Sequence, residues 1–255
     1  MTDTIGDTIS VDLKRTLKRL KLSPMLDTLP ERLVLARQRK TPHQDFLELV
    51  LADEVSRRDR LSGELRARRA NLDPAMVLEA WDDTSKVRFD RELWAELTTL
   101  RFLEDHHNVL LMGPVGVGKT FMATALGHIA CRRGRTVAMV RADRMLKKLK
   151  AARLDGTHAQ ELRRLIAVDL LVLDDFALHA MDHTETQDVY DLVVERHRRA
   201  STITTSNRTP DETVGMMADA LLAQSALDRL QSAAFELVIE GESYRRRQKP
   251  ERRTR

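Results

Sequence analysis

The spacing of apolar residues predicts helices over about the first 105 positions of the chain. A first helical segment, residues 11–22, is interrupted by Ser23-Pro24, because a residue before proline is driven out of the helical conformation. A second segment covers residues 26–39, and a third follows Thr41-Pro42, which supply an N-cap and a proline suited to a first turn. We therefore predict a small all-helical N-terminal domain over residues 1–75.

The pattern changes after a junction over residues 76–107. From residue 108 onward, short runs that are apolar on both faces alternate with segments of helical period, as in a parallel sheet covered by helices. The expected strands are Val109–Met112, Thr136–Val140, Leu170–Leu173, Thr202–Thr205 and Glu236–Ile239. The expected helices are Lys119–Arg133, Asp143–Arg153, Ala159–Ile166, Thr186–Arg199 and Met216–Ser232. We predict an α/β domain over residues 108–243 and a basic tail over residues 244–255.

The formal net charge of +4 comes from this tail. Residues 244–255 contain seven basic residues and one acidic residue, whereas the preceding 243 residues contain 36 Lys and Arg against 38 Asp and Glu. Such a tail is either an arm that contacts nucleic acid or a solubilising end. A second basic stretch, Arg57–Arg69, contains six arginines and is either a solvated helix face or a helix that contacts phosphates.

Composition excludes several classes of protein. The chain has no run of eighteen apolar residues, and its first twenty residues include several charges, so neither a membrane span nor a secretory signal is expected. A single cysteine, Cys131, excludes an internal disulfide framework and a multi-cysteine metal site. We expect a cytoplasmic protein that has no membrane partner.

One motif predicts a phosphate-binding loop. Residues 113–120 have the sequence G-x-x-x-x-G-K-T and lie between an expected strand and an expected helix, as such a loop requires. Glycines let backbone N–H groups wrap around phosphate oxygens, the lysine reaches the β- and γ-phosphates, and the threonine hydroxyl ligates Mg²⁺. The expected nucleotide-binding residues are Gly113, Pro114, Val115, Gly116, Val117, Gly118, Lys119, Thr120 and Phe121.

Two later strands end in polar residues that complete this site. One strand is followed by Asp174, which would hold Mg²⁺ together with Thr120, and by Asp175, which would orient or deprotonate the attacking water. The next strand leads to Asn207, our first choice for a side chain that contacts this water or the γ-phosphate; Ser206 is the second. With Lys119 as a catalytic residue, this set predicts hydrolysis of ATP.

Arg229 has two interpretations. It follows Asp228 on a late apolar helix. It is either an arginine finger that reaches the γ-phosphate of a neighbouring subunit or part of a surface ion pair with Asp228. The spacing alone leaves both open.

The order of these motifs resembles the IstB-like family, the ATP-binding helper proteins of transposition, which are AAA+ ATPases related to DnaC-like helicase loaders. The resemblance rests on the loop at 113–120, Leu-Val-Leu-Asp-Asp-Phe at 171–176, Thr-Thr-Ser-Asn-Arg at 204–208, Leu-Asp-Arg-Leu at 227–230 and Gly-Glu-Ser-Tyr-Arg at 241–245. It implies an AAA+ P-loop core with sheet order 5-1-4-3-2 and helices on both faces, behind the helical N-terminal domain. It also implies that Asn207 occupies the sensor-1 position, and it favours the finger role for Arg229.

The resemblance further implies cofactors and partners. These are ATP and Mg²⁺, a homo-oligomer that assembles with ATP on double-stranded DNA, and a cognate transposase that the protein stimulates. A helicase loader acting in replication is the alternative function, and a metabolic P-loop kinase is a weaker one. If DNA is the partner, we expect contacts at Arg57–Arg69 and at the tail Arg245–Arg255.

This sequence departs from the family pattern at two places. Many relatives have Asp-Glu where this chain has Asp174-Asp175, and aspartate is shorter by one methylene. The chain after the last expected strand is too short for the helical lid of a typical AAA+ module. Arg245 is the nearest replacement for the sensor-2 arginine that such a lid supplies.

Overall fold

The computed structural model describes residues 9–82 and 87–244, and it divides the chain into two compact units, Met1–Ser62 and Gly63–Arg255. The division falls earlier than the boundary predicted at residue 75, because the last turns of a long helix pack into the second unit. The segment predicted as a junction, residues 76–107, is part of the second unit, because residues such as Leu97, Phe102 and Leu103 are buried in its core. Within the described ranges, no helix is both long and apolar enough to cross a membrane.

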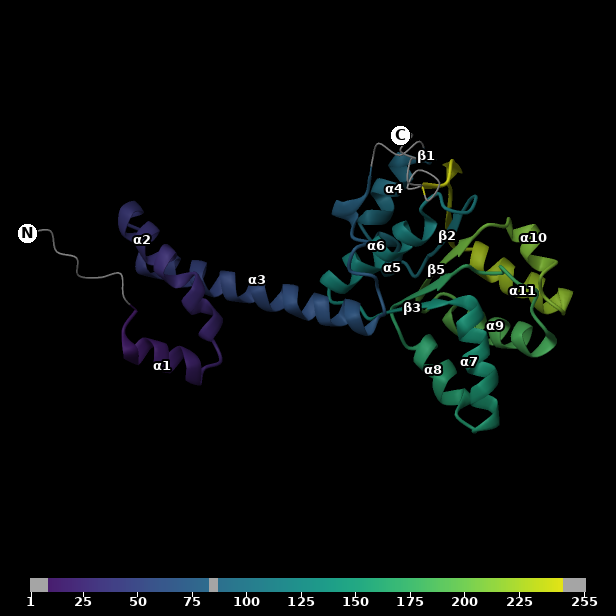
Figure 1. Cartoon of the computed structure of the whole chain (residues 1–255), viewed down its shortest axis with the longest axis horizontal. Coiled ribbons are helices and arrows are strands. Elements are labelled where there is room, and N and C mark those ends of the chain that lie inside the picture. The colour runs from purple at the N-terminus through teal and green to yellow at the C-terminus, as the bar shows by residue number, and fades with distance from the viewer. Residues whose placement is uncertain (1–8, 83–86, 245–255) are drawn as a thin grey trace, which may run out of the picture. The chain divides into compact units, whose positions relative to one another are not determined.

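The first unit is a small cluster of helices (Figure 1). Its core consists of apolar residues from each helix, and an ion pair between Arg32 and Asp53, with Nε and Oδ2 2.7 Å apart, joins two of the helices. Its elements are α1 (Val11–Arg19), the 3-10 turn η1 (Ser23–Asp27), α2 (Leu29–Arg39) and the first part of α3 (His43–Arg69). The buried core residues are Ile9, Leu17, Met25, Leu29 and Val50. The all-helical prediction for this region is confirmed.

The second unit is built on a parallel five-stranded sheet with the order β3-β4-β5-β2-β6. The strands are β2 (Asn108–Met112), β3 (Val137–Arg141), β4 (Leu170–Asp174), β5 (Ser201–Ser206) and β6 (Ala234–Val238). Counted from β2 as the first strand of the core and read from β6, this order is 5-1-4-3-2, as expected. A separate antiparallel pair, β1 (Val87–Arg88) with β7 (Glu240–Gly241), is not among the predicted strands.

Helices cover both faces of this sheet (Figure 1). Alternate residues of β4 face opposite ways: Leu170 and Val172 belong to one apolar cluster, and Leu171 and Leu173 belong to the other. The first cluster includes η2 (Leu78–Ala80), α4 (Arg91–Thr98), α5 (Arg101–Glu104) and α6 (Lys119–Arg132). The second includes α7 (Ala142–Leu154), α8 (His158–Ile166), α9 (His183–Arg196), α10 (Pro210–Val214) and α11 (Ala220–Gln231). The predicted α/β class is therefore confirmed.

Candidate functional site

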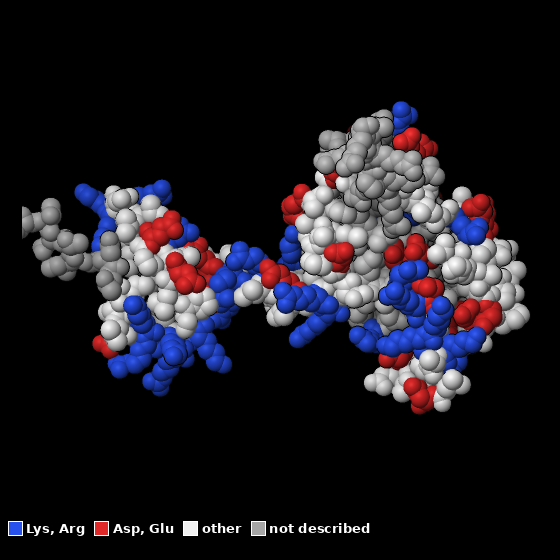
Figure 2. Space-filling view, viewed as in Figure 1, with Lys and Arg blue, Asp and Glu red and all other residues white. Residues whose placement is uncertain are grey.

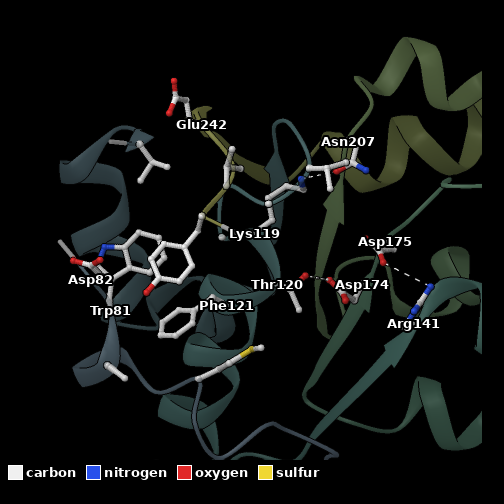
Figure 3. Close-up of a pocket in the computed structure, with 18 of the residues that line it drawn as sticks. Trp81, Asp82, Lys119, Thr120, Phe121, Arg141, Asp174, Asp175, Asn207 and Glu242 are labelled. Atoms are coloured by element: carbon white, nitrogen blue, oxygen red, sulfur yellow. Dashed lines mark hydrogen bonds and ion pairs between the residues drawn. The ribbon is translucent and has the colours of Figure 1, made fainter. Parts of the chain in front are cut away.

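A cavity of about 630 Å³ lies where the carboxyl ends of β2, β4 and β5 meet (Figure 3). Because the strands are parallel and adjacent, the residues that follow each of them share this edge of the sheet. The polar residues that line the cavity come from the loop after β2 and from the ends of β3, β4 and β5. They are Lys119, Thr120, Arg141, Asp174, Asp175 and Asn207, with Asp82 and Glu242 at the wall.

The loop between β2 and α6 contains three glycines whose backbone angles and close neighbours disfavour any side chain. Gly113, Gly116 and Gly118 have φ values of +148°, +85° and +104°, a region that favours glycine. A Cβ atom at Gly116 would lie 2.1 Å from Oγ of Ser243, and the Tyr244 N–H donates to the Gly116 carbonyl at 2.9 Å. The segment after β7 is therefore packed directly on the loop.

The ammonium group of Lys119 is buried within this loop. The residue is only 6% exposed, and its Nζ donates to the carbonyl oxygens of Gly113 and Pro114 at 2.6 and 2.7 Å and to Oδ1 of Asn207 at 2.5 Å. A buried charge requires such acceptors, and the N-terminus of α6 adds further positive potential at the same point. The arrangement is suited to an anion, which would be a stronger acceptor for Lys119 than these two carbonyls and the Asn207 amide.

Asp174 lies beside the hydroxyl of Thr120. Thr120 Oγ1 donates to Oδ1 of Asp174 at 2.8 Å, and Thr205 Oγ1 donates to the same atom at 2.7 Å. The carboxylate is buried, so these two hydroxyls hold its orientation. Thr205 is not among the predicted site residues, although its place on the strand next to β4 could have indicated it.

Asp175 projects into the cavity from a backbone that is unusual for a non-glycine residue. Its φ is +54°, and its N–H donates to Oγ1 of Thr205 at 3.0 Å. Nη2 of Arg141 lies 3.8 Å from Oδ2 of Asp175, and Nε of Arg141 lies 3.2 Å from Oδ1 of Asp143. Sequence reasoning also missed Arg141, although it is the last residue of β3 and pairs in register with Asp174.

An aromatic wall closes the opposite side of the cavity (Figure 3). The rings of Trp81 and Phe121 have centroids 5.3 Å apart, and a Cβ atom at Gly118 would lie 2.9 Å from the Trp81 ring. Phe121 is one of the predicted binding residues. Trp81 is not, because it lies far from the loop in the sequence.

The remaining predicted residues fall in different places. Val115, Gly116, Val117 and Gly118 line the cavity, whereas Gly113 and Pro114 contribute the carbonyls that hold Lys119. Ser206, the second choice at the end of β5, donates to the Phe176 carbonyl at 3.2 Å instead. Arg245 lies outside the described residues.

Arg229 lies on α11, away from the residues that line the cavity. Its Nη1 donates to the Ser225 carbonyl at 2.8 Å, and its guanidinium carbon lies 6.0 Å from the centroid of the Tyr190 ring. Among the described residues, no ion pair joins it to Asp228. Arg229 is therefore not one of the groups that this subunit brings to its own cavity.

Comparison with known proteins identifies close relatives over nearly the whole chain. The family described as IstB-like ATP binding protein matches residues 15–252. An insertion-sequence ATP-binding protein of Mycobacterium tuberculosis is 36% identical over 243 residues, which are 95% of this chain and 97% of that protein. The ATP-binding protein of insertion sequence IS21 from Pseudomonas aeruginosa is 33% identical over 238 residues, which are 93% of this chain and 90% of that protein.

A solved structure supports the fold. The crystal structure of DnaI aligns with a TM-score of 0.54 at 20% identity, covering 66% of this chain and 89% of DnaI. At this identity the likeness concerns the fold alone.

The packing of Ser243 on the loop predicts different costs for two glycine substitutions. Gly116→Ala and Gly134→Ala both place a Cβ at positive φ, +85° and +83°, but a Cβ at Gly134 has no atom within 4 Å. Gly134→Ala should therefore lose about 1–2 kcal/mol of stability from strain alone. Gly116→Ala should lose more and should also weaken nucleotide binding at least tenfold, because Ser243 must move.

Urea denaturation and titration with a fluorescent ATP analogue measure these two effects. Equal stability losses and equal nucleotide affinities in the two variants would contradict the contact between the loop and the segment after β7.

Proposed function

The chain belongs to the family of IstB-like ATP-binding proteins, which are ATPases of the AAA+ class, and from this premise we propose that it hydrolyses ATP while assembled on target DNA and stimulates a cognate transposase. The relatives are ATP-binding proteins of insertion sequences, so this chain acts as an ATPase in the transposition of an insertion sequence. The observation that supports the proposal most directly is the convergence of Lys119, Thr120, Asp174, Asp175 and Asn207 on one cavity.

The loop and Lys119 would bind the phosphates. Backbone N–H groups of a glycine-rich loop at a helix N-terminus surround phosphate oxygens, and the ammonium of Lys119 neutralises charge on the β- and γ-phosphates. Lys119 already lies within the loop and needs only to exchange carbonyl acceptors for phosphate oxygens. The aromatic wall of Trp81 and Phe121 offers the nucleobase an apolar face.

The donor set beside the loop suits Mg²⁺. The Thr120 hydroxyl and the Asp174 carboxylate lie within 2.8 Å of each other, and hard divalent cations prefer oxygen ligands of these kinds. We propose that these two residues hold the ion, Asp174 through water. Bound Mg²⁺ would neutralise charge that develops on the phosphates.

Asp175 and Asn207 would act on the attacking water. The carboxylate of Asp175 is about one-third exposed and lines the cavity, so it can accept a proton from water there. Asn207 lies beside Lys119 and can hydrogen-bond either the water or the γ-phosphate. Aspartate is shorter than glutamate, and the left-handed backbone of Asp175 changes the direction from which its carboxylate enters the cavity.

Arg229 would complete the site of a neighbouring copy. On α11 its guanidinium contacts Ser225 and Tyr190, and within residues 9–82 and 87–244 it forms no ion pair with a carboxylate that would neutralise its charge. An arginine supplied across a subunit interface stabilises negative charge in the transition state of phosphoryl transfer. This role requires a homo-oligomer, which we propose forms with ATP on duplex DNA.

A helicase loader would use the same nucleotide chemistry. The likeness to DnaI concerns the fold alone, whereas the matched family and its insertion-sequence relatives extend over nearly the whole chain. Transposition is therefore the function that we propose.

Phosphate release and duplex binding test the proposal together. We expect Mg²⁺-dependent ATP hydrolysis and binding of the full chain to duplex DNA. Lys119→Ala should lower the hydrolysis rate by about two to three orders of magnitude, because it removes the charge that faces the phosphates. A chain that neither hydrolyses ATP nor binds duplex DNA would contradict the proposal.

Mixing two inactive variants tests the role of Arg229. Lys119→Ala removes a site but keeps the arginine, whereas Arg229→Ala keeps a site but removes the arginine. If Arg229 acts across the interface, each variant alone is inactive, and an equal mixture regains activity at about a quarter of its interfaces by random assembly.

The matched control for this experiment is Arg199→Ala, which removes an exposed arginine that contacts Glu195 at 3.2 Å and should keep full activity. A mixture no more active than the sum of its separate components would exclude an arginine finger at Arg229.

A further inference from the structure

Helix α1 and the residues after it present a basic surface on the first unit (Figure 2). Five cationic side chains lie within eight positions, and each of these residues is exposed. The only acidic residue of α1 is Asp12, which lies 2.7 Å from Nη2 of Arg15 in a pair whose side chains are both about 80% exposed. Such an exposed pair is weak. The five cationic residues, defined here as the α1 basic surface, are Lys14, Arg15, Lys18, Arg19 and Lys21.

The packing of α1 determines that these charges face outward. Leu17 is buried in the core of the first unit with Ile9 and Met25, so the opposite side of the helix faces solvent. Arg15 and Arg19 lie on that opposite side, and Lys14 and Lys18 form a second pair beside it. The members of each pair are four positions apart, which is about 6 Å along the helix axis. The helix therefore presents a row of cations rather than isolated charges.

The arginines of the neighbouring helix α3 are used differently. Nε of Arg57 and Nε of Arg58 each donate to Glu54 at 2.7 Å, and both arginines lower the pKa of the Glu54 carboxyl to about 2. Glu54 therefore stays ionised at neutral pH and keeps both guanidinium groups. Arg66 donates to the Cys131 carbonyl at 2.9 Å. At least three of the six arginines expected to contact phosphates thus have partners within the protein.

One of these contacts supports the α1 basic surface. Nη2 of Arg58 donates to the carbonyl oxygen of Lys21 at 3.2 Å, which joins α3 to the turn after α1. Lys21 has a φ of +57°, so this hydrogen bond helps to hold a turn that a lysine alone would not favour. The fold therefore holds the backbone of Lys21 in place just beyond the end of α1.

We propose that the α1 basic surface binds the phosphate backbone of duplex DNA. This inference deepens the proposed function, on which it rests, because it assigns the DNA contact of the first unit to α1 rather than to the Arg57–Arg69 stretch. Duplex DNA has one negative charge per about 1.7 Å of its axis, so a row of cations spaced by helical turns faces phosphates in any sequence.

The apolar residues of α1 favour this partner over a lipid surface. Val11 and Leu20 are 79% and 61% exposed, but they are nine positions apart, which places them on opposite sides of a helix. A helix that lies in a membrane interface needs a continuous apolar face beside its basic face. Leu13, which is 41% exposed, lies seven positions before Leu20 and therefore on the same side of the helix, but Leu17, the apolar residue between these two on that side, is already buried in the protein core.

The salt dependence of DNA binding tests the inference. We define the Gln variant as the full chain with three substitutions, Lys14→Gln, Lys18→Gln and Lys21→Gln. This variant should bind a mixed-sequence duplex at least tenfold more weakly than the wild type at about 0.1 M salt. It should also reduce the slope of log K against log salt by about 0.9 for each phosphate that the variant no longer neutralises. Fluorescence anisotropy of a labelled duplex across a salt series measures both quantities.

Two variants serve as controls. Arg37→Gln, Arg39→Gln and Lys40→Asn remove three charges from the end of α2 in the same unit and should leave the slope unchanged. Lys14→Arg, Lys18→Arg and Lys21→Arg keep the charges and should retain the wild-type slope. All three sets of substitutions should leave ATP hydrolysis without DNA and the helical circular dichroism signal unchanged.

The outcomes separate this inference from the function on which it rests. A wild-type chain that fails to bind duplex DNA overturns the proposed function. A wild-type chain that binds, together with a Gln variant that keeps the wild-type affinity and slope, overturns the inference alone. Loss of binding to phosphatidylserine vesicles by the Gln variant, with duplex binding unchanged, also overturns it and assigns the surface to lipid.

Discussion

The burial of the Lys119 ammonium is the interaction on which the rest of the site depends. A charge that is taken out of water needs hydrogen-bond acceptors. Lys119 has two of them in the carbonyls of its own loop and another in Asn207, which is far from this loop in the sequence. The loop after β2 and the end of β5 must therefore lie side by side, and the parallel pairing of these strands provides this arrangement. These three acceptors are neutral, so a phosphate anion would be a stronger partner for Lys119 than any of them.

Much of the site could be predicted because its signals are local. The loop at 113–120 is recognisable from its own residues, and Asp174 and Asn207 follow apolar strands whose carboxyl ends share one edge. Thr205 and Arg141 were missed because their roles depend on which strands are neighbours and in what register. The β1–β7 pair has strands of only two residues, too short for any periodic pattern. For the Arg57–Arg69 stretch, composition leaves both a solvated helix face and a phosphate contact open, because it does not reveal that Glu54 binds two of its arginines.

The two units contribute different chemistry to one proposed activity. The second unit brings the groups that act on phosphates to one cavity, but its Arg229 lies elsewhere, which is consistent with a site completed by another copy. The first unit has exposed cations on α1 that lie outside its apolar core. A requirement for several copies would link hydrolysis to assembly, and a basic surface on each copy would link assembly to DNA.

The central claim is that the cavity recognises the β- and γ-phosphates through Lys119 and the loop, and a comparison of nucleotide affinities tests it most directly. Isothermal titration of the full chain with ATP and with AMP, both with Mg²⁺, measures the contribution of these two phosphates. The account predicts that ATP binds at least about a hundredfold more tightly, since the charged contacts are made to groups that AMP lacks. AMP affinity within about threefold of that of ATP would contradict it.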